Sequence, residues 1–104
     1  MKININQELK NIDGTTVKPA VLLKSICIQA LLANDPKSTK EDLLKRWILA
    51  TSIQNSKDDI FDLTTDQIVS IKDMCYIAYK DKTIIYSQTV LMLENIKEDE
   101  QNDK

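Results

Sequence analysis

Few residues in this chain have side chains that could carry out chemistry. The chain has 104 residues, with no histidine, two cysteines and a single glycine. Histidine is the usual proton shuttle and a frequent metal ligand, and loops that bind phosphate need several glycines. The composition therefore argues against most kinds of catalysis, and we expect no catalytic residue and no enzyme.

The nearest approach to a metal site is the acidic pair Asp58 and Asp59, with Asp62 close by. Clustered carboxylate oxygens are the ligands that Ca²⁺ or Mg²⁺ prefers. An EF-hand loop also needs a central glycine and a bidentate glutamate at fixed spacing, and this segment has neither. We interpret it as a solvated acidic loop and predict neither a metal site nor a bound cofactor.

The two thiols, Cys27 and Cys75, each lie in an apolar stretch with helical spacing. A thiol in such a stretch behaves as a small hydrophobic side chain, and no histidine is present to activate it as a nucleophile. We predict that both are reduced and buried. The chain begins without the apolar run of a signal peptide, and no window approaches the ~20 apolar residues of a membrane span. A cytoplasmic protein without a membrane partner is therefore expected.

Trp47 is the first candidate for a binding surface. Tryptophan is enriched at binding hot spots, so this residue could anchor an interface. Its spacing with Leu43, Leu44 and Ile48 equally suits an ordinary helix core, and we favour the core.

Three tyrosines complete the candidate partner interface. Tyr76 and Tyr79 are three residues apart, and Tyr86 follows near the junction of two predicted helices. Tyrosines whose hydroxyl is solvent-exposed are common at interfaces, but half-buried positions where two helices meet explain the same pattern. The sequence leaves both interpretations open for Tyr76, Tyr79 and Tyr86.

The N-terminal segment has the pattern of a hairpin. Residues 3–6 alternate between isoleucine and asparagine, which is the period of a half-buried strand. Asp13-Gly14 suits a two-residue hairpin turn, and residues 15–17 have the β-branching of a return strand. We therefore predict a β-hairpin over residues 2–18, which must pack on the helices because a lone hairpin is only marginally stable.

The first two predicted helices follow. Pro19 suits the first turn of a helix over residues 20–33. Ser38 and Glu41 have the spacing of a capping box at the start of a second helix, which runs to about Gln54. The predicted inner face of this second helix consists of Leu43, Leu44, Trp47, Ile48 and Thr51.

Stronger signals mark the third and fourth helices. Thr64 and Gln67 form a second capping box, and Leu63 and Ile68 are placed for a hydrophobic staple around it. The third helix presents apolar residues at helical spacing on one side. After a polar interruption, Thr83 can cap a fourth helix that ends near Asn95. Residues Ile85, Val90 and Leu93 place apolar groups on more than one side of this helix, so a homo-oligomer is a further prediction.

Charge is distributed unevenly along the chain. Residues 1–93 carry 12 Lys/Arg and 11 Asp/Glu, for a net charge of +1, whereas residues 94–104 carry 2 and 5, for a net charge of −3. The near-neutral body lacks the basic footprint of a nucleic-acid binder. We predict a single globular domain over residues 1–94 and a disordered acidic tail over residues 95–104.

The order of segments resembles that of a group of small proteins encoded by bacteriophages and prophages. The matching segments are Met1–Leu9, Ile12-Asp13-Gly14, Cys27–Ala33, Glu41–Ala50 with its Lys45-Arg46 pair, Leu63-Thr64, and Ala78-Tyr79 through Glu94. Members of the group often carry a proline and a glycine near the junction of helices 3 and 4, where this chain has Asp81-Lys82-Thr83 and Tyr86-Ser87-Gln88. The group has no assigned activity, so the resemblance transfers no functional residue.

These observations together predict an α+β fold, mainly α, in which an N-terminal β-hairpin packs on a compact four-helix bundle. The expected function is a non-enzymatic, phage-encoded interaction protein with a protein-binding surface. It would act in virion or tail assembly, or on a host factor in the host cytoplasm. Two alternatives are an inhibitor that blocks a host defence nucleoprotein through its acidic tail, and a small DNA-binding regulator whose binding would be salt-sensitive.

Overall fold

The computed structural model describes residues 1–94, and the acidic tail predicted for residues 95–104 lies outside the described residues. The elements, in chain order, are β1 (Lys2–Asn4), α1 (Leu23–Leu31), α2 (Lys40–Asn55), β2 (Ile60–Asp62), α3 (Thr65–Tyr79) and α4 (Thr83–Leu93). Four helices and a two-stranded antiparallel sheet at the N-terminus confirm the predicted fold class, α+β and mainly α.

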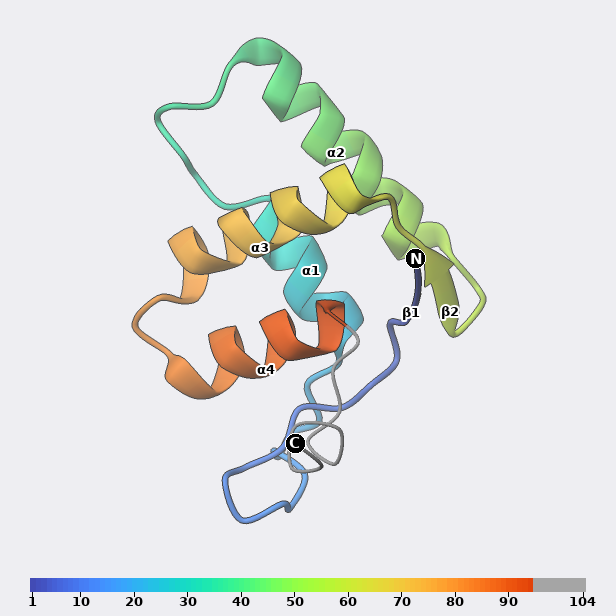
Figure 1. The fold of residues 1–104 in the computed structure, drawn as a ribbon, viewed down its shortest axis with the longest axis vertical. Helices are drawn as coiled ribbons and strands as arrows, with labels where there is room; N and C mark the ends of the chain where they lie inside the picture. Colours follow the sequence, from blue (N-terminus) through green and yellow to red (C-terminus); the bar gives the residue numbers. More distant parts are fainter. Residues whose placement is uncertain (95–104) are drawn as a thin grey trace, which may run out of the picture.

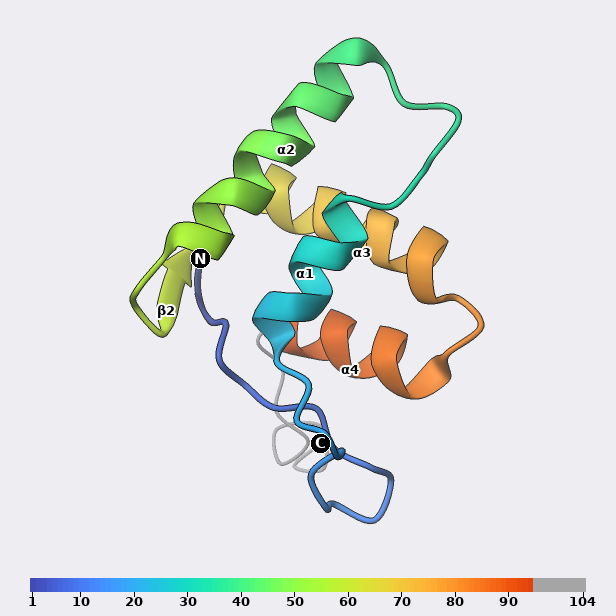
Figure 2. The same cartoon turned by 180° about the vertical axis from the view of Figure 1, so that it is seen from behind.

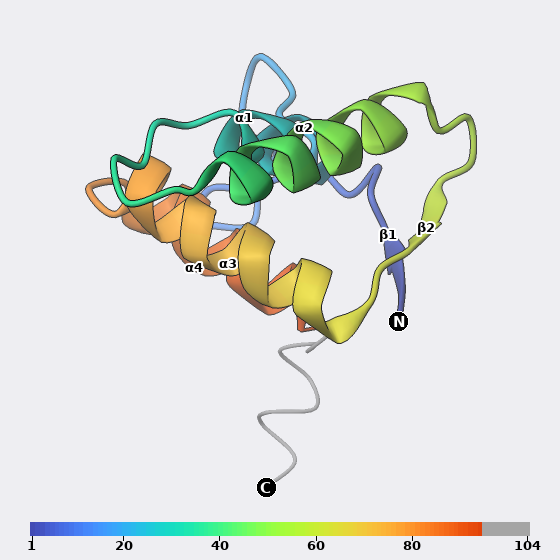
Figure 3. The same ribbon diagram turned by 90° about the horizontal axis from the view of Figure 1, so that it is seen from above.

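Helix α1 is the central element of the fold. It contacts each of the other three helices, and α3 and α4 also pack on each other (Figures 1 and 2). Seen from above, α1 and α2 lie on one side of the molecule and α3 and α4 on the other (Figure 3). Helix α2 therefore lies at the outer edge, with one side on α1 and the opposite side free of other elements among the described residues.

The partner of the first strand differs from the prediction. Strand β1 pairs antiparallel with β2, with Ile3 opposite Phe61, rather than with residues 15–17. The predicted alternation is nevertheless confirmed, because Ile3 and Ile5 are buried whereas Asn4 is exposed. Leu63, which directly follows β2, is also buried, and its N–H donates to the carbonyl of Met1 at 2.8 Å.

The segment around Gly14 turns as predicted, but with a different loop. The backbone N–H of Gly14 donates to the carbonyl of Asn11, and the N–H of Asn11 donates to the carbonyl of Thr15. These bonds enclose a three-residue loop, Ile12-Asp13-Gly14, with Gly14 alone at positive φ (+90°). A turn followed by a left-handed glycine is a common three-residue hairpin loop. The return segment makes a single bridge, Lys10 with Thr16, in place of the predicted strand.

Helix α1 begins later than predicted. Its first residue is Leu23, and Pro19 follows a cis peptide bond in the preceding loop rather than occupying the first helical turn. Backbone hydrogen bonds explain the delay, because the N–H of Leu9 donates to the carbonyl of Val21 and the N–H of Leu23 donates to that of Gln7. These bonds hold residues 21 and 22 in an extended conformation that cannot join the helix.

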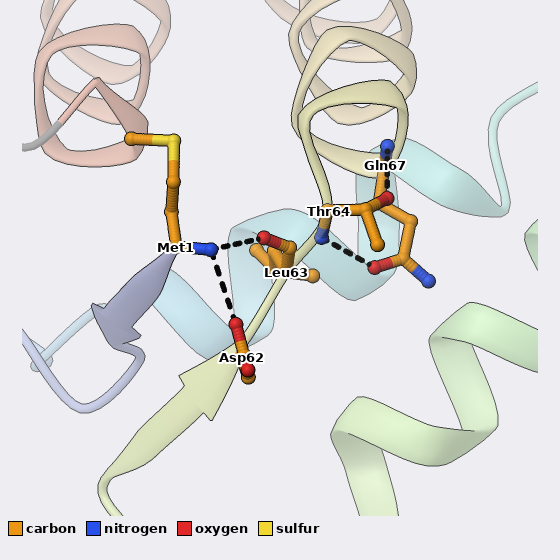
Figure 4. A network of polar contacts seen from close by, with 5 residues as sticks. All are labelled: Met1, Asp62, Leu63, Thr64 and Gln67. Carbon is orange, nitrogen blue, oxygen red and sulfur yellow. Dashed lines mark hydrogen bonds and ion pairs between the residues drawn. The ribbon is translucent and has the colours of Figure 1, made fainter.

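Helix α3 begins at the capping box that the sequence predicts. The Thr64 hydroxyl accepts the backbone N–H of Gln67, and the Gln67 side chain accepts the N–H of Thr64 (Figure 4). The terminal ammonium of Met1 lies beside this cap, where it donates to the carbonyl of Leu63 at 2.7 Å and to Asp62 at 3.1 Å. The start of the chain, the end of β2 and the start of α3 are thereby joined.

Candidate functional site

The N-terminus of α2 is capped one residue later than predicted. Thr39, not Ser38, is the N-cap, and Asp42, not Glu41, completes the capping box. The Thr39 hydroxyl accepts the N–H of Asp42 at 3.1 Å, and the Asp42 carboxylate accepts the N–H of Thr39 at 3.1 Å. Hydrogen bonds from Thr39, first from its backbone and then from its side chain, lower the pKa of Asp42 below its usual value. Ser38 instead accepts a hydrogen bond from Arg46.

The inner face predicted for α2 is wrong. Leu43, Leu44, Trp47 and Ile48, hereafter the α2 stripe, are between 55% and 64% exposed. The residues that face the core are instead Arg46, Leu49, Ala50 and Ile53. The only tryptophan of the chain is thus a surface residue, and the favoured core interpretation of Trp47 is incorrect.

The stripe is exposed because α2 has apolar residues on two sides. One side bears Leu49, Ala50 and Ile53, which pack in the core with α1. The α2 stripe lies on the opposite side, and no other element among the described residues covers it. A helix with two apolar sides needs two covers. The apolar residues on two sides of α2 are visible in the sequence, and they are the signal that could have identified the stripe.

Polar side chains next to the stripe already have partners within α2. The hydroxyls of Thr51 and Ser52 both donate to the carbonyl of Ile48, each at 2.9 Å. Lys45 pairs with Glu41 at 3.1 Å, one helical turn away. The stripe is therefore bordered by polar groups whose hydrogen bonds are satisfied.

Arg46 is a charged residue on the buried side of α2. Its guanidinium donates to the Met74 sulfur and to the Ser38 hydroxyl, both at 2.7 Å, while its Nε has no partner. No carboxylate forms an ion pair with it among the described residues. Arg46 also lines a cleft of about 390 Å³, together with the edge residue Ile48 of the stripe. Lys45, Leu49 and Ser52 of α2 also line this cleft, and residues of β2 and of the first turns of α3, Phe61 among them, form its other side.

The three candidate tyrosines differ in exposure and in their contacts. Tyr76 of α3 and Tyr86 of α4 make an edge-to-face contact with ring centroids 5.6 Å apart. Tyr79 is half-buried, and burial, followed by the charges of Cys75 and Cys27, raises the pKa of its hydroxyl. Tyr76 is exposed, so it alone of the three presents most of its ring to solvent. The contact between Tyr76 and Tyr86 gives both rings a role in joining α3 to α4.

Both cysteines are buried and free, as predicted. Burial, with an added contribution from Cys75, raises the pKa of Cys27 far above its usual value. Burial likewise raises the pKa of Cys75 to about 12. Thiols with these pKa values remain protonated near neutral pH, so neither can act as a nucleophile in this structure.

The acidic loop makes contacts that support the fold. The N–H of Ile5 donates to the carbonyl of Asp59, and the Asn6 side chain donates to the Asp59 carboxylate. Within residues 1–94, no group of three histidine, cysteine, aspartate or glutamate side chains is placed to hold a metal ion. In the same range, no helix is long and apolar enough to span a membrane.

The apolar residues of α4 are largely used inside the molecule. Leu93 is completely buried, and Ile85 and Val90 are half-buried. Lys72 of α3 pairs with Glu94 just beyond α4 at 3.0 Å, which holds the end of this helix against α3. Leu93 is therefore not available to a second copy, and the homo-oligomer that the sequence predicts from apolar groups on more than one side of α4 stays a prediction.

Comparison of the chain with models of protein families, with curated proteins and with solved structures found no match. Among the large apolar side chains that the described residues expose, four lie together in the α2 stripe.

Proposed function

We propose that this protein is a non-enzymatic binding protein and that the α2 stripe is its protein-binding surface. The observation that carries the proposal is the exposure of Leu43, Leu44, Trp47 and Ile48, four large apolar side chains on one helix. Scattered apolar residues on a surface are normal, but a contiguous group with a polar border is typical of interaction sites. Tryptophan is also enriched among the residues that dominate binding energy.

Support for a role without catalysis comes from the available side chains. The chain has no histidine, and both thiols are protonated at neutral pH because burial raises their pKa. The carboxylates whose pKa is shifted, Asp13 and Asp42, are solvent-exposed, and hydrogen bonds lower their pKa. A general acid needs a raised carboxyl pKa, so these shifts are opposite to those required.

The proposed setting is the cytoplasm of a phage host. This follows from the resemblance of residues 1–94 to small phage and prophage proteins, and two free cysteines are compatible with a reducing compartment. Within that setting the stripe would contact a phage-encoded protein, a second copy of this chain included, in virion or tail assembly, or a host factor.

Site-specific photo-crosslinking in the cells that express the gene tests the proposal. A photoreactive phenylalanine analogue replaces Leu43, at the end of the stripe, so that Trp47 stays intact. The matched control carries the same analogue in place of Ile84, an exposed apolar residue of α4. We expect a discrete protein adduct from position 43 and none from position 84.

A second substitution makes this experiment decisive. Adding Trp47→Glu to the position-43 probe should abolish the adduct, because a buried carboxylate is costly in an apolar interface. Far-ultraviolet circular dichroism checks that the variant remains folded. Absence of any adduct from position 43, or an adduct that persists with Trp47→Glu, would contradict the proposed surface.

A further inference from the structure

We propose that the partner of the α2 stripe is a second copy of this chain, packed antiparallel along α2 about a two-fold axis. This inference rests on the proposed function, because it names the occupant of the same surface. Four properties of α2 support it: the distribution of large and small side chains, the satisfied polar border, the balance of charge, and the apolar area.

The side of α2 that carries the stripe has bulky residues toward its N-terminal end and small residues toward its C-terminal end. Leu43 and Leu44 lie in the N-terminal half of α2, whereas the same side of the C-terminal half carries Thr51 and Ser52. An axis between Trp47 and Ile48 places Leu44 against the partner's Thr51. Each bulky half then packs on a small half, as helices do when ridges enter grooves. A parallel pairing would instead oppose bulky residues at one end and leave a gap at the other.

Covering this surface leaves the hydroxyl groups of Thr51 and Ser52 with the hydrogen bonds that they donate. The hydroxyls of Thr51 and Ser52 already donate to the carbonyl of Ile48. When they are buried, their protons therefore keep a hydrogen-bond acceptor. The main cost of burying a polar group is the loss of such a bond. The hydroxyls therefore oppose the pairing little, although they are polar groups inside the interface.

The charges that border the stripe cancel. Lys40 and Lys45 are balanced by Glu41 and Asp42, and all four are exposed. Two copies can therefore approach without net repulsion. A strongly charged partner such as a nucleic acid would have no opposite charge here to attract it. The antiparallel arrangement also aligns the two helix dipoles favourably.

The stripe is large enough for a modest dimer. Four side chains of this size, each more than half exposed, present an apolar area on the order of 400–500 Å². Helix α2 has 16 residues, and such a helix is about 24 Å long. Two copies would bury about twice the apolar area, and the polar border would bring the total to roughly the lower limit of 1,200 Å² for stable specific interfaces.

Sedimentation equilibrium of the purified full chain, from about 1 µM to about 1 mM, tests the proposal over the affinity range expected for a small interface. We expect a reversible monomer–dimer equilibrium. Trp47→Glu and, separately, Leu44→Lys should each weaken it at least about tenfold, because each places a charge in the apolar contact. The control Ile84→Lys should change it by less than about twofold, because position 84 is on α4.

Cysteine pairing tests the orientation. Leu44→Cys and Thr51→Cys chains are mixed and gently oxidised, and the parent chain, whose two thiols are buried, gives the background. The antiparallel arrangement predicts disulfides mainly between position 44 of one chain and position 51 of the other. Dominant pairing of position 44 with itself, or no pairing above background, would overturn the proposed arrangement.

The outcomes separate this inference from the proposed function. A chain that is monomeric throughout the range, or a dimer that Trp47→Glu leaves intact, overturns the second copy as the occupant. The proposed function survives those results if the probe at position 43 forms an adduct with a different protein. It fails only when position 43 gives no adduct at all, or one that Trp47→Glu does not remove.

Discussion

Helices α2 and α3 are similar in length and in the way they begin, yet they pack differently in the fold. They have 16 and 15 residues, each begins with a threonine N-cap, and each has a complete capping box. The buried face of α3 consists of Ile68, Ile71, Met74 and Cys75, which lie in the core, whereas α2 exposes its largest apolar residues and buries Arg46.

The difference shows that helix formation and helix docking are specified separately. Capping residues and apolar spacing fix where each helix begins and that it is a helix. Which side faces inward depends on the neighbours, and only α3 lies between two of them, α1 and α4. Helix α2 packs chiefly on α1, so a narrow inner face is enough to attach it.

The largest expected difference between the helices is seen when one isoleucine of each is truncated to alanine. Ile71→Ala should lower the free energy of unfolding by about 3 kcal/mol, because Ile71 is fully buried in α3 and its truncation leaves a cavity. Ile48→Ala should lower it by less than about 0.5 kcal/mol in the monomer, because that side chain is exposed. Urea denaturation at low protein concentration measures both, and equal losses would refute the contrast between the helices.

Arg46 provides the next test, since it is a charge on the inner side of α2. Arg46→Ala should lower the free energy of unfolding by about 2 kcal/mol, because it removes the buried stem and leaves Ser38 without a donor. Arg46→Met should leave stability unchanged or raise it by about 1 kcal/mol, since a buried guanidinium without an ion pair is costly. Thermal and urea unfolding would show this, and a similar loss in both variants would mean that the guanidinium bonds stabilise the fold.

The two caps should differ in their effect on global stability. Thr64→Ala should lower the free energy of unfolding by about 1 kcal/mol, the usual value for an N-cap. Thr39→Ala should cost about half as much, because residues 40–45 are all exposed and can fray without opening the core. Urea denaturation of the two variants is the measurement, and a larger loss for Thr39→Ala would reverse the proposed order.

The smallest expected effect is the different response of the two capping boxes to low pH. The pKa of Asp42 is lowered from its usual 3.8 in the folded protein, so its contribution to stability is present above pH 3.8 and is lost as pH falls through the lower folded value. The corresponding residue of α3 is Gln67, which does not titrate. Nuclear magnetic resonance from neutral pH to about pH 2 should therefore shift the backbone amide signal of Thr39 far more than that of Thr64. Parallel shifts of the two amides would contradict this assignment.

Local sequence signals predicted the helices and turns well. Leu63, Thr64, Gln67 and Ile68 all indicate the same helix start, and α3 begins there. The turn at Gly14 was likewise predictable because it needs a residue that adopts positive φ. Interactions between distant segments were not predictable in this way. The pairing of Ile3 with Phe61 and the backbone bonds that delay α1 depend on residues far apart in the chain.

The candidate site was predicted only in part. Trp47 was among the candidates, but the spacing of Leu43, Leu44 and Ile48 was taken to indicate the core. A period of 3.6 residues identifies a helical face without stating what covers it. The polar residue at position 46 gave no sign of burial either, because arginine is usually exposed. The two apolar sides of α2 are visible in the sequence, but the position of α1 decides which of them is buried.

The cysteines allow one practical use of this fold. Cys27 of α1 and Cys75 of α3 are its only thiols, and both are enclosed in the core. A thiol reagent can therefore react only after the core around α1 and α3 opens, so the labelling rate reports the opening equilibrium when reclosing is fast and the opening rate when the reagent outpaces reclosing. Because α2 carries no cysteine, thiol labelling reports on opening of the core between α1 and α3 and does not detect local unfolding of α2.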